Sequence, residues 1–154
     1  DSAIPLGTVS FNILIDAHVA AANFLEAERC LQRMVQASIL ASEVTYSSII
    51  SAWASDVERS ASWLWRVARH EEEILRTVHF NAYLRIACEI DVEETSKEAL
   101  PILHRLRLQP DGHTFAILVS ASASAGKWTE AEDWLDAARQ AAPGSQARCL
   151  EVLL

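Results

Sequence analysis

The chain has 154 residues, and its 51% hydrophobic content is enough to bury a core. The 21 acidic residues outnumber the 13 basic ones, giving a formal net charge of −8, whereas proteins built to hold a polyanion usually show the opposite balance. No apolar run reaches the roughly 18 residues of a membrane-spanning helix, and four glycines and four prolines leave little material for β-turns.

The cysteines predict neither a disulfide framework nor a metal site. Cys30, Cys88 and Cys149 are far apart in the chain and odd in number, and no CxxC pair is present. We interpret them as small buried hydrophobic residues in a reducing compartment. We expect no cofactor and no bound metal.

The segment from Val9 to Met34 predicts two short helices separated by a break near residues 20–23. Neither helix could bury its apolar stripe alone, so the pair needs a neighbour of the same kind. The residues that recur at helical spacing are Phe11, Leu14, Ile15 and His18 in the first helix, and Phe24, Ala27, Cys30, Leu31 and Met34 in the second.

Three later segments repeat this pattern, beginning at Val44 (VTYSSIISAW), Val78 (VHFNAYLRIA) and His113 (HTFAILVSAS). Each carries an aromatic residue at the same phase, and the spacings between successive aromatics are 35, 34 and 35 residues. A period of about 34 residues with a helical hairpin in each unit is typical of an α-solenoid. The sequence therefore predicts an all-α solenoid of about four stacked helix-turn-helix repeats. The four aromatics are Phe11, Tyr46, Phe80 and Phe115.

The predicted repeats span residues 8–42, 43–76, 77–111 and 112–146. We expect residues 1–7 to be the tail of a preceding repeat, and residues 147–154 to start a further repeat or a cap helix. Neither end shows the polar cap that a terminal solenoid repeat needs. The chain is therefore expected to be an internal segment of a longer array.

The second predicted repeat is the richest in tryptophan. Trp53, Trp63 and Trp65 are expected to form core between repeats, but Trp63 and Trp65 cannot both point inward from one helix. An exposed indole here would mark a possible protein contact. His70 precedes three glutamates but lacks a second histidine at metal-binding spacing, which favours a solvated helix end.

Proline and glycine predict boundaries in the last two repeats. Pro101 is expected to kink the second helix of its repeat or to shift that helix's boundary. In the last repeat, Gly126 is expected to break the helix pair, and Thr129 to act as an N-cap. The stripe predicted to be buried in the helix that follows consists of Trp128, Ala131, Trp134, Leu135 and Ala138.

Across residues 8–146 the repeated segments resemble the pentatricopeptide repeat, whose idealised unit reads VTYNTLI…G-(aliphatic)-EA…M…PD. The matching stretches include VSFNILID, VTYSSIISAW and the LQPD that ends at Asp111. The tetratricopeptide repeat has the same period, but its characteristic Trp and Gly-Tyr placements are missing here. The resemblance implies a non-catalytic RNA-binding protein of a mitochondrion or chloroplast, whose first helices line a groove that reads one base per repeat of single-stranded RNA.

The resemblance also assigns site residues. A base edge is read by the residue after the aromatic together with the last residue of the repeat, and an aliphatic residue two before the aromatic packs on base faces. An amide beside a hydroxyl or carboxylate can match the edge of a pyrimidine. The implied reading pairs are Asn12 with Ser42, Ser47 with Arg76, Asn81 with Asp111 and Ala116 with Gln146, and the implied stacking residues are Val9, Val44, Val78 and His113.

One departure from the family pattern bears on RNA binding. Near the end of the first helix the family often has a lysine that meets the phosphate, and none of the four places here holds a cation. Phosphate contacts supply most of the non-specific affinity, so this groove should hold RNA poorly unless flanking repeats supply charge. The four residues are Ala20, Ser55, Glu89 and Ser124.

Two functions are consistent with these observations. The first is a segment of an organellar RNA-binding or RNA-processing factor. The second is a protein–protein scaffold in an organellar assembly, favoured by the acidic charge, the missing lysines and the tryptophans. We do not predict an enzyme, because no paired carboxylates, Ser/His/Asp set, phosphate loop or metal-ligand spacing is convincing.

Overall fold

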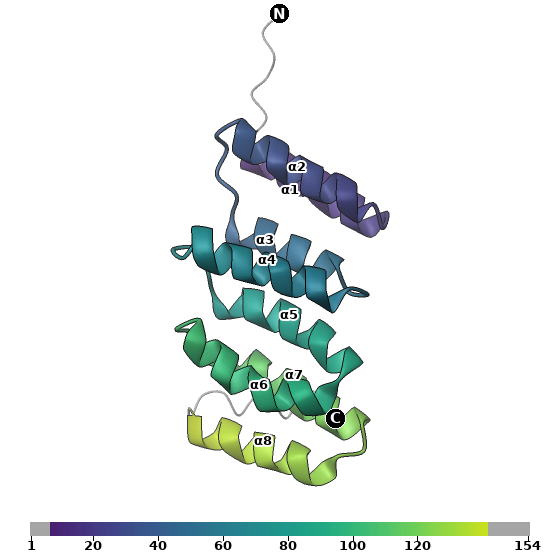
Figure 1. Ribbon diagram of the computed structural model, residues 1–154, viewed down its shortest axis with the longest axis vertical. Helices are drawn as coiled ribbons and strands as arrows, with labels where there is room; N and C mark the ends of the chain where they lie inside the picture. Colours follow the sequence, from purple (N-terminus) through teal and green to yellow (C-terminus); the bar gives the residue numbers. More distant parts are fainter. Residues whose placement is uncertain (1–6, 142–154) are drawn as a thin grey trace, which may run out of the picture. The chain divides into compact units, whose positions relative to one another are not determined.

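The computed structural model describes residues 7–141, and these form four helical hairpins (Figure 1). The chain divides into two compact units, which meet in sequence between Leu75 and Arg76. Unit 1 contains α1 (Thr8–Ala20), α2 (Phe24–Gln36), α3 (Glu43–Ala52) and α4 (Val57–His70). Unit 2 contains α5 (Thr77–Ile90), α6 (Val92–Arg105), α7 (Gly112–Ser124) and α8 (Trp128–Ala141).

The four repeated aromatics occupy equivalent positions. Each is the fourth residue of the first helix of its hairpin, and none exposes more than 5% of its surface. Burying an aromatic at one fixed place gives each hairpin the same anchor in its core. The predicted all-α fold of helical-hairpin repeats is confirmed. The aromatics are Phe11 in α1, Tyr46 in α3, Phe80 in α5 and Phe115 in α7.

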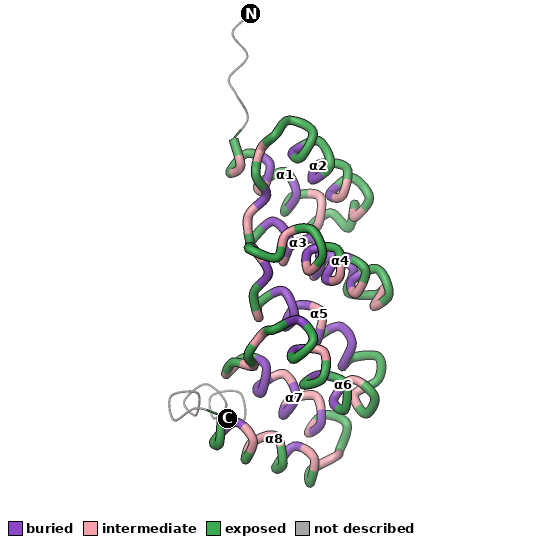
Figure 2. The backbone as a smooth tube through the Cα atoms, turned by 60° about the vertical axis from the view of Figure 1, so that its left-hand side comes forward, coloured by how far each residue is buried: buried purple, intermediate pink, exposed green. Residues whose placement is uncertain are grey.

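Within each unit the first helices form the packing centre. In unit 1, α1 packs against α2 and α3, and α3 also packs against α2 and α4. In unit 2, α5 packs against α6 and α7, and α7 also packs against α6 and α8. Buried residues alternate with exposed ones along α1, α2 and α4, whereas α5 and α7 are buried or half-buried over most of their length (Figure 2). The predicted division into repeats at given residues stays a prediction.

The predicted breaks at residues 20–23 and at Gly126 are confirmed. At the first break the N–H of Asn23 donates to the carbonyl of His18 at 2.8 Å, and Ala22 takes a positive φ of 56°. Gly126 has a φ of 74°, a backbone conformation that is free of strain only without a Cβ atom. Both turns satisfy carbonyl groups that the ends of α1 and α7 leave open.

The structure bears on two expected helix features. Helix α6 continues through Pro101 to Arg105, which excludes a shifted boundary, and the alternative of a kink at Pro101 stays a prediction. The expected N-cap of the next helix was wrong. Helix α8 begins at Trp128, which makes Thr129 its second residue and not its N-cap.

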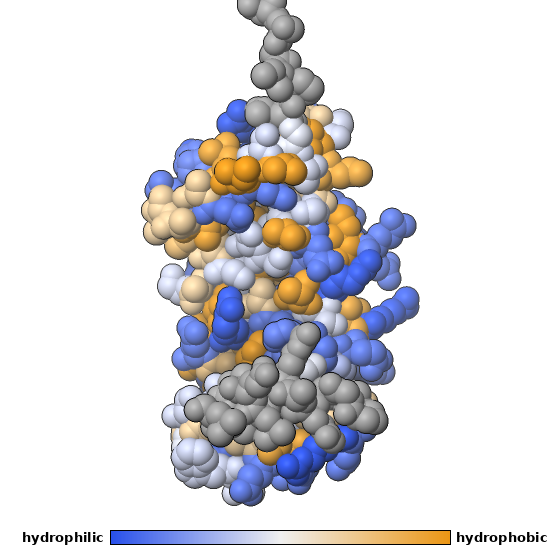
Figure 3. Space-filling model, turned by 180° about the vertical axis from the view of Figure 1, so that it is seen from behind, coloured by the Kyte–Doolittle hydropathy of each residue, from blue (hydrophilic) through white to orange (hydrophobic). Residues whose placement is uncertain are grey.

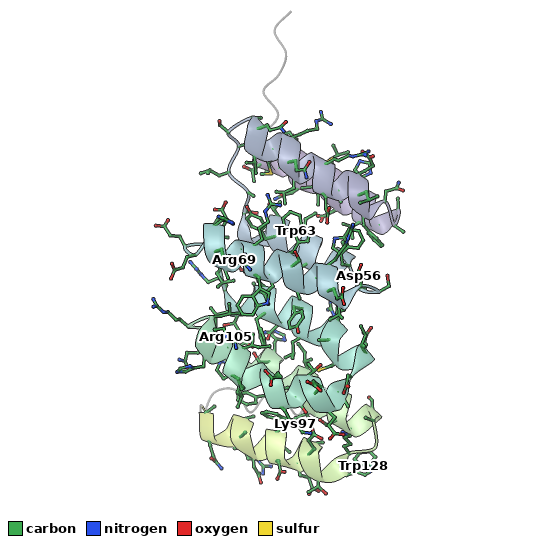
Figure 4. The ribbon with its side chains drawn as sticks, viewed as in Figure 1. Asp56, Trp63, Arg69, Lys97, Arg105 and Trp128 are labelled. Carbon is green, nitrogen blue, oxygen red and sulfur yellow. The ribbon has the colours of Figure 1, made fainter. Side chains whose placement is uncertain are left out.

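The predicted buried stripe of α8 was wrong at its first member. Trp128 exposes 67% of its surface and lies at the start of α8, beside the turn that follows α7 (Figure 4). Ala131 and Ala138 are buried as predicted, and Trp134 is partly buried. Leu14 of α1 was also expected on the buried stripe but is 39% exposed.

The tryptophans of unit 1 correct a predicted contact surface. Trp53 and Trp63 are buried, and both indole N–H groups donate to Oε1 of Glu28, at 2.8 and 2.7 Å. Arg59 lies over the Trp53 ring and Arg66 over the Trp63 ring. Because their polar ends are satisfied inside the unit, these two indoles are not exposed protein contacts.

Trp63 is buried and Trp65 is only partly buried, so the expectation that the two cannot both point inward is confirmed. The predicted role of Trp65 as a protein contact stays a prediction.

The thiols of Cys30 and Cys88 are free and buried. Burial raises the pKa of both thiols, that of Cys88 to about 11. Cys149 and the predicted helix at 147–154 lie outside the described residues, as do residues 1–6 of the predicted leading tail.

Candidate nucleic-acid interface

In unit 1 the candidate site is built on the start of α3. Ser42 is the N-cap, and its hydroxyl accepts from the backbone N–H of Thr45 at 3.3 Å. In return, the backbone N–H of Ser42 donates to Oγ1 of Thr45 at 2.9 Å. This reciprocal capping box satisfies two otherwise open N–H groups and fixes both hydroxyls in space. A residue predicted to read a base is therefore also one that starts a helix.

Asn12 of α1 joins this capping box from the preceding hairpin. Oγ1 of Thr45 donates to Oδ1 of Asn12 at 2.6 Å, and Nδ2 of Asn12 lies 3.4 Å from Oγ of Ser42. The structure thus brings together Asn12 and Ser42, which are 30 residues apart in sequence. The amide retains donor and acceptor capacity that these contacts do not use.

Two exposed valines lie near this polar cluster. Val9 precedes Asn12 by about one turn of α1, on the same face, and is 71% exposed. Val44 is the second residue of α3 and is 59% exposed. Seen from behind, unit 1 displays hydrophobic side chains among polar ones (Figure 3). Exposed aliphatic side chains beside an amide provide the two contacts that an unstacked base can use, an apolar face and a polar edge.

Unit 2 contains the same arrangement with a carboxylate in place of a hydroxyl. Asp111 is the N-cap of α7, and its Oδ1 accepts from the backbone N–H of Thr114 at 2.9 Å. Asn81 donates from Nδ2 to that same oxygen at 3.0 Å, and Thr114 donates from Oγ1 to Oδ1 of Asn81 at 2.8 Å. These residues are the second predicted pyrimidine pair, brought together in the same way.

The surroundings of Asp111 keep it ionised. Burial opposes ionisation, but hydrogen bonds from the Thr114 backbone, the Asn81 amide and the Thr114 hydroxyl, together with the nearby His113, hold the pKa of Asp111 below its usual value. An ionised carboxylate only accepts hydrogen bonds. The flanking stacking positions are Val78, which is 41% exposed, and His113, which is also exposed.

For the other two predicted pairs the structure describes only single residues. The hydroxyl of Ser47 donates to the backbone carbonyls of Glu43 and Val44 in its own helix, and its predicted partner Arg76 precedes α5 in unit 2. Ala116 is buried in a cluster with Phe115 and Ala138, where its methyl group contributes to the core. Gln146 lies outside the described residues.

Sequence reasoning missed Thr45 and Thr114, which complete the two clusters. Both are at most 1% exposed, and each donates its hydroxyl to the asparagine of the preceding hairpin that is predicted to read a base. Their spacing in S-x-x-T and D-x-x-T is that of a capping box, a signal that the sequence did contain. The pattern does not show that a third residue, 33 positions earlier, would join the box.

Few cations accompany these clusters. The four places where the family often has a lysine hold Ala20, Ser55, Glu89 and Ser124, and all four are exposed. A groove of about 720 Å³ between α5 and α7 runs from His113 to Ser124 and contains Arg85 and Glu89, which are of opposite charge.

Two searches of the described residues bear on other functions. Within residues 7–141 no group of three or more His, Cys, Asp and Glu side chains is placed to hold a metal ion. None of the helices in this range is both long enough and apolar enough to traverse a bilayer. That the chain is not an enzyme stays a prediction.

Residues 6–55, which include α1, α2 and α3, match the model of the PPR repeat family. This match identifies the repeat type within residues 6–55 as a pentatricopeptide repeat. Asn12, Ser42 and Val44 all lie within the matched residues. No curated protein sequence matches the chain.

Solved pentatricopeptide repeat structures share the fold. The structure of PPR10 from maize is 17% identical with a TM-score of 0.68, over 94% of this chain and 21% of PPR10. PPR10 in complex with an 18-nucleotide RNA element is 16% identical with a TM-score of 0.73, over 99% of this chain and 24% of that one.

A third structure, nuclear proteinaceous RNase P 2 (PRORP2) from A. thaliana, is 16% identical with a TM-score of 0.61, over 96% of this chain and 34% of PRORP2. The chain therefore spans about a fifth to a third of the length of these structures.

Proposed function

We propose that this chain is a segment of a single-stranded RNA-binding factor and that each unit reads one pyrimidine. The observation that carries the proposal is the amide cluster that occurs once in each unit. Asn12 lies against Ser42 and Thr45 in unit 1, and Asn81 lies against Asp111 and Thr114 in unit 2.

The chemistry of each cluster suits a pyrimidine edge. An asparagine whose amide is held on one side presents a remaining N–H and a remaining lone pair, and a pyrimidine offers adjacent donor and acceptor atoms on its Watson–Crick edge. The exposed side chains at Val9 and Val44 in unit 1, and at Val78 and His113 in unit 2, provide surface for base faces. A family match and an RNA-bound neighbour of the same fold add support.

The charge of the chain limits the affinity that we expect. With a net charge of −8 and Ala20, Ser55, Glu89 and Ser124 where the family often has lysine, few counterions would be released on binding. We therefore expect weak binding by this segment and a shallow dependence on salt. Basic flanking repeats would be needed for tight binding.

The experiment is an NMR titration of the 154-residue chain with oligouridine and oligoadenosine of equal length at low salt. Oligouridine should shift the side-chain amide signals of Asn12 and Asn81 more than oligoadenosine does. The exposed amide of Gln32 on α2 is the control and should not move. Asn12→Ala and Asn81→Ala should each weaken oligouridine binding, whereas Gln32→Ala should not. Unmoved Asn12 and Asn81 signals at saturating RNA would overturn the proposal.

A protein scaffold is the second candidate, because an acidic chain without phosphate-binding lysines suits a protein partner better than a polyanion. The exposed Trp128 on α8 is a candidate contact, and the predicted contact at the partly buried Trp65 on α4 is a second one. Partners recovered from an extract should survive nuclease treatment if this candidate is correct. Loss of every partner on that treatment would eliminate it.

We also infer that the protein works in an organelle, a mitochondrion or chloroplast, on the basis of the family resemblance. Fractionation of cells with an antibody against the chain tests this location. Recovery only in the nuclear or cytosolic fraction would contradict it.

A further inference from the structure

We propose that Thr45 is a positioning residue, which fixes the orientation of the Asn12 amide and thereby decides which pyrimidine the unit 1 site prefers. The inference rests on the proposed RNA-reading function and adds a residue outside the two-residue pair. It starts from a difference between the two clusters, because the equivalent Thr114 is not needed to orient the Asn81 amide in unit 2.

The contact distances around Asn12 favour one amide orientation. The 2.6 Å separation of Thr45 Oγ1 from Asn12 Oδ1 fits an O–H···O hydrogen bond, whose usual length is about 2.7 Å. It is too short for an amide N–H···O bond of about 2.9 Å, so turning the amide over would lengthen this contact. The other contact, from Asn12 Nδ2 to Ser42 Oγ, is 3.4 Å long and weak.

Ser42 alone would not keep this orientation. A serine hydroxyl both donates and accepts, so it can meet either end of an amide by rotating. Without the Thr45 hydroxyl, Asn12 would meet Ser42 equally well through Nδ2 or Oδ1. The Thr45 hydroxyl can also donate or accept, but its 2.6 Å contact fits only donation to Oδ1 of Asn12, whereas the 3.4 Å contact of Ser42 fixes neither end of the amide. The hydroxyl of Thr45, which is 1% exposed, is therefore the group that sets the amide orientation in unit 1.

In unit 2, Asp111 fixes the orientation of the Asn81 amide. Its carboxylate only accepts, so Asn81 must direct Nδ2 toward it, as the 3.0 Å contact shows. The Thr114 hydroxyl also lies 3.0 Å from the same Asp111 oxygen, so it can donate either to that oxygen or to Oδ1 of Asn81. Removing the Thr114 hydroxyl should leave Asn81 oriented as before.

An oriented amide discriminates between uracil and cytosine, because the two bases exchange donor and acceptor atoms along the same edge. An amide free to turn over matches both bases. The two units therefore differ in which residue controls preference, although their reading asparagines are the same.

The first test needs no RNA. In the unmodified chain, NMR should show close approach of the Asn12 side-chain NH2 protons to the Ser42 methylene protons. Thr45→Val should weaken this signal, and Thr45→Ser should retain it. Thr114→Val removes the equivalent capping hydroxyl in unit 2 but should leave Asn81 directed at Asp111. Equal changes in both units would indicate a purely structural role and overturn the proposal.

The second test measures preference as the ratio of affinities for oligouridine and oligocytidine. In an Asn81→Ala background, which isolates the Asn12 site, we expect one pyrimidine to be favoured by about fivefold, the factor that an ordinary hydrogen bond supplies. Thr45→Val should bring the ratio close to one with little change in mean affinity, and Thr45→Ser should retain the preference. Ser42→Asp together with Thr45→Val should restore a preference by giving Asn12 an acceptor-only partner.

The outcomes separate this proposal from the function that it rests on. If the orientation signals behave as expected but no variant or parent binds RNA, both the RNA-reading function and the specificity role of Thr45 are overturned. If RNA binds at Asn12 and the preference survives Thr45→Val, the positioning role alone is overturned. Circular dichroism of each variant confirms that the loss of a capping hydroxyl has not unfolded α3 or α7.

Discussion

The two units hold the same asparagine in different ways. Unit 1 surrounds Asn12 with two hydroxyls, each able to donate or accept, whereas unit 2 sets Asn81 against an ionised carboxylate. The backbone arrangement is the same in both, because each cluster is a capping box joined by a side chain of the preceding hairpin. The comparison shows that a serine or an aspartate at the N-cap gives the same asparagine partners of different hydrogen-bonding capacity.

The cores of the units differ as well. In unit 2 the first helix, α5, buries eight of its residues, whereas α1 of unit 1 buries only Phe11 and Ile15. Unit 1 instead uses a polar anchor, in which Glu28 accepts from the indoles of Trp53 and Trp63. The stability of unit 1 should therefore depend more on one carboxylate, and that of unit 2 more on apolar burial.

The largest expected effect is that of Phe80→Ala in unit 2. Phe80 is fully buried in the helix with the most buried residues, so its removal should cost about 4–5 kcal/mol of unfolding free energy, the upper range for such a change. Phe11→Ala in the less buried α1 should cost about 3 kcal/mol. Urea denaturation followed by circular dichroism measures both. Equal costs would show that the two helices are equally packed.

The polar anchor of unit 1 gives the next largest effect. Glu28→Ala would leave two buried indole N–H groups without their acceptor and should cost about 2–3 kcal/mol. The matched change in unit 2 is Glu130→Ala, which should cost about 1 kcal/mol because the Ser96 hydroxyl can turn to the Glu93 carbonyl. Urea denaturation followed by tryptophan fluorescence measures both losses of unfolding free energy. A smaller loss for Glu28→Ala than for Glu130→Ala would contradict the role of Glu28 as a polar anchor.

Replacing single indoles should sharpen the same contrast. Trp63→Phe removes a donor that Glu28 satisfies and should cost about 1–2 kcal/mol. Trp134 of α8 has a buried indole N–H that no atom of the described residues accepts, so Trp134→Phe should change stability by less than about 0.5 kcal/mol or even raise it. Thermal unfolding of the two variants measures the difference. A larger loss for Trp134→Phe would contradict it.

The smallest effect is a pH dependence in unit 2. Hydrogen bonds from Lys97 and then Lys127 lower the pKa of Glu93 to about 2 from 4.5. The unfolded chain therefore binds more protons between these values, so the contribution of Glu93 to stability is present above pH 4.5 and is lost as the pH falls toward 2. Because Glu93 is exposed, salt should screen the effect.

Glu93→Gln should flatten the acid side of the curve of unfolding free energy against pH. The matched control is Glu26→Gln in unit 1, where an exposed carboxylate pairs with Arg29 in its own helix. Acid titrations of urea stability at several pH values provide the measurement. An unchanged slope for Glu93→Gln would contradict the assignment.

The sequence by itself determined the helices, their pairing into hairpins and the burial of the four repeated aromatics, because helical periodicity and a fixed repeat are local properties of the chain. It failed at Trp128, whose helical phase suits the core but whose place beside a turn leaves it exposed.

Only the tertiary structure decided how the candidate sites are held. In each cluster the asparagine lies 30 residues before the N-cap and 33 before the threonine, and no periodicity states which atoms of successive hairpins meet. The capping-box spacing predicts the contact within a helix start, but the approach of Asn12 or Asn81 depends on how one hairpin packs against the next. For the same reason the Glu28 anchor could not be read from the chain, since it joins α2 to tryptophans of the following hairpin.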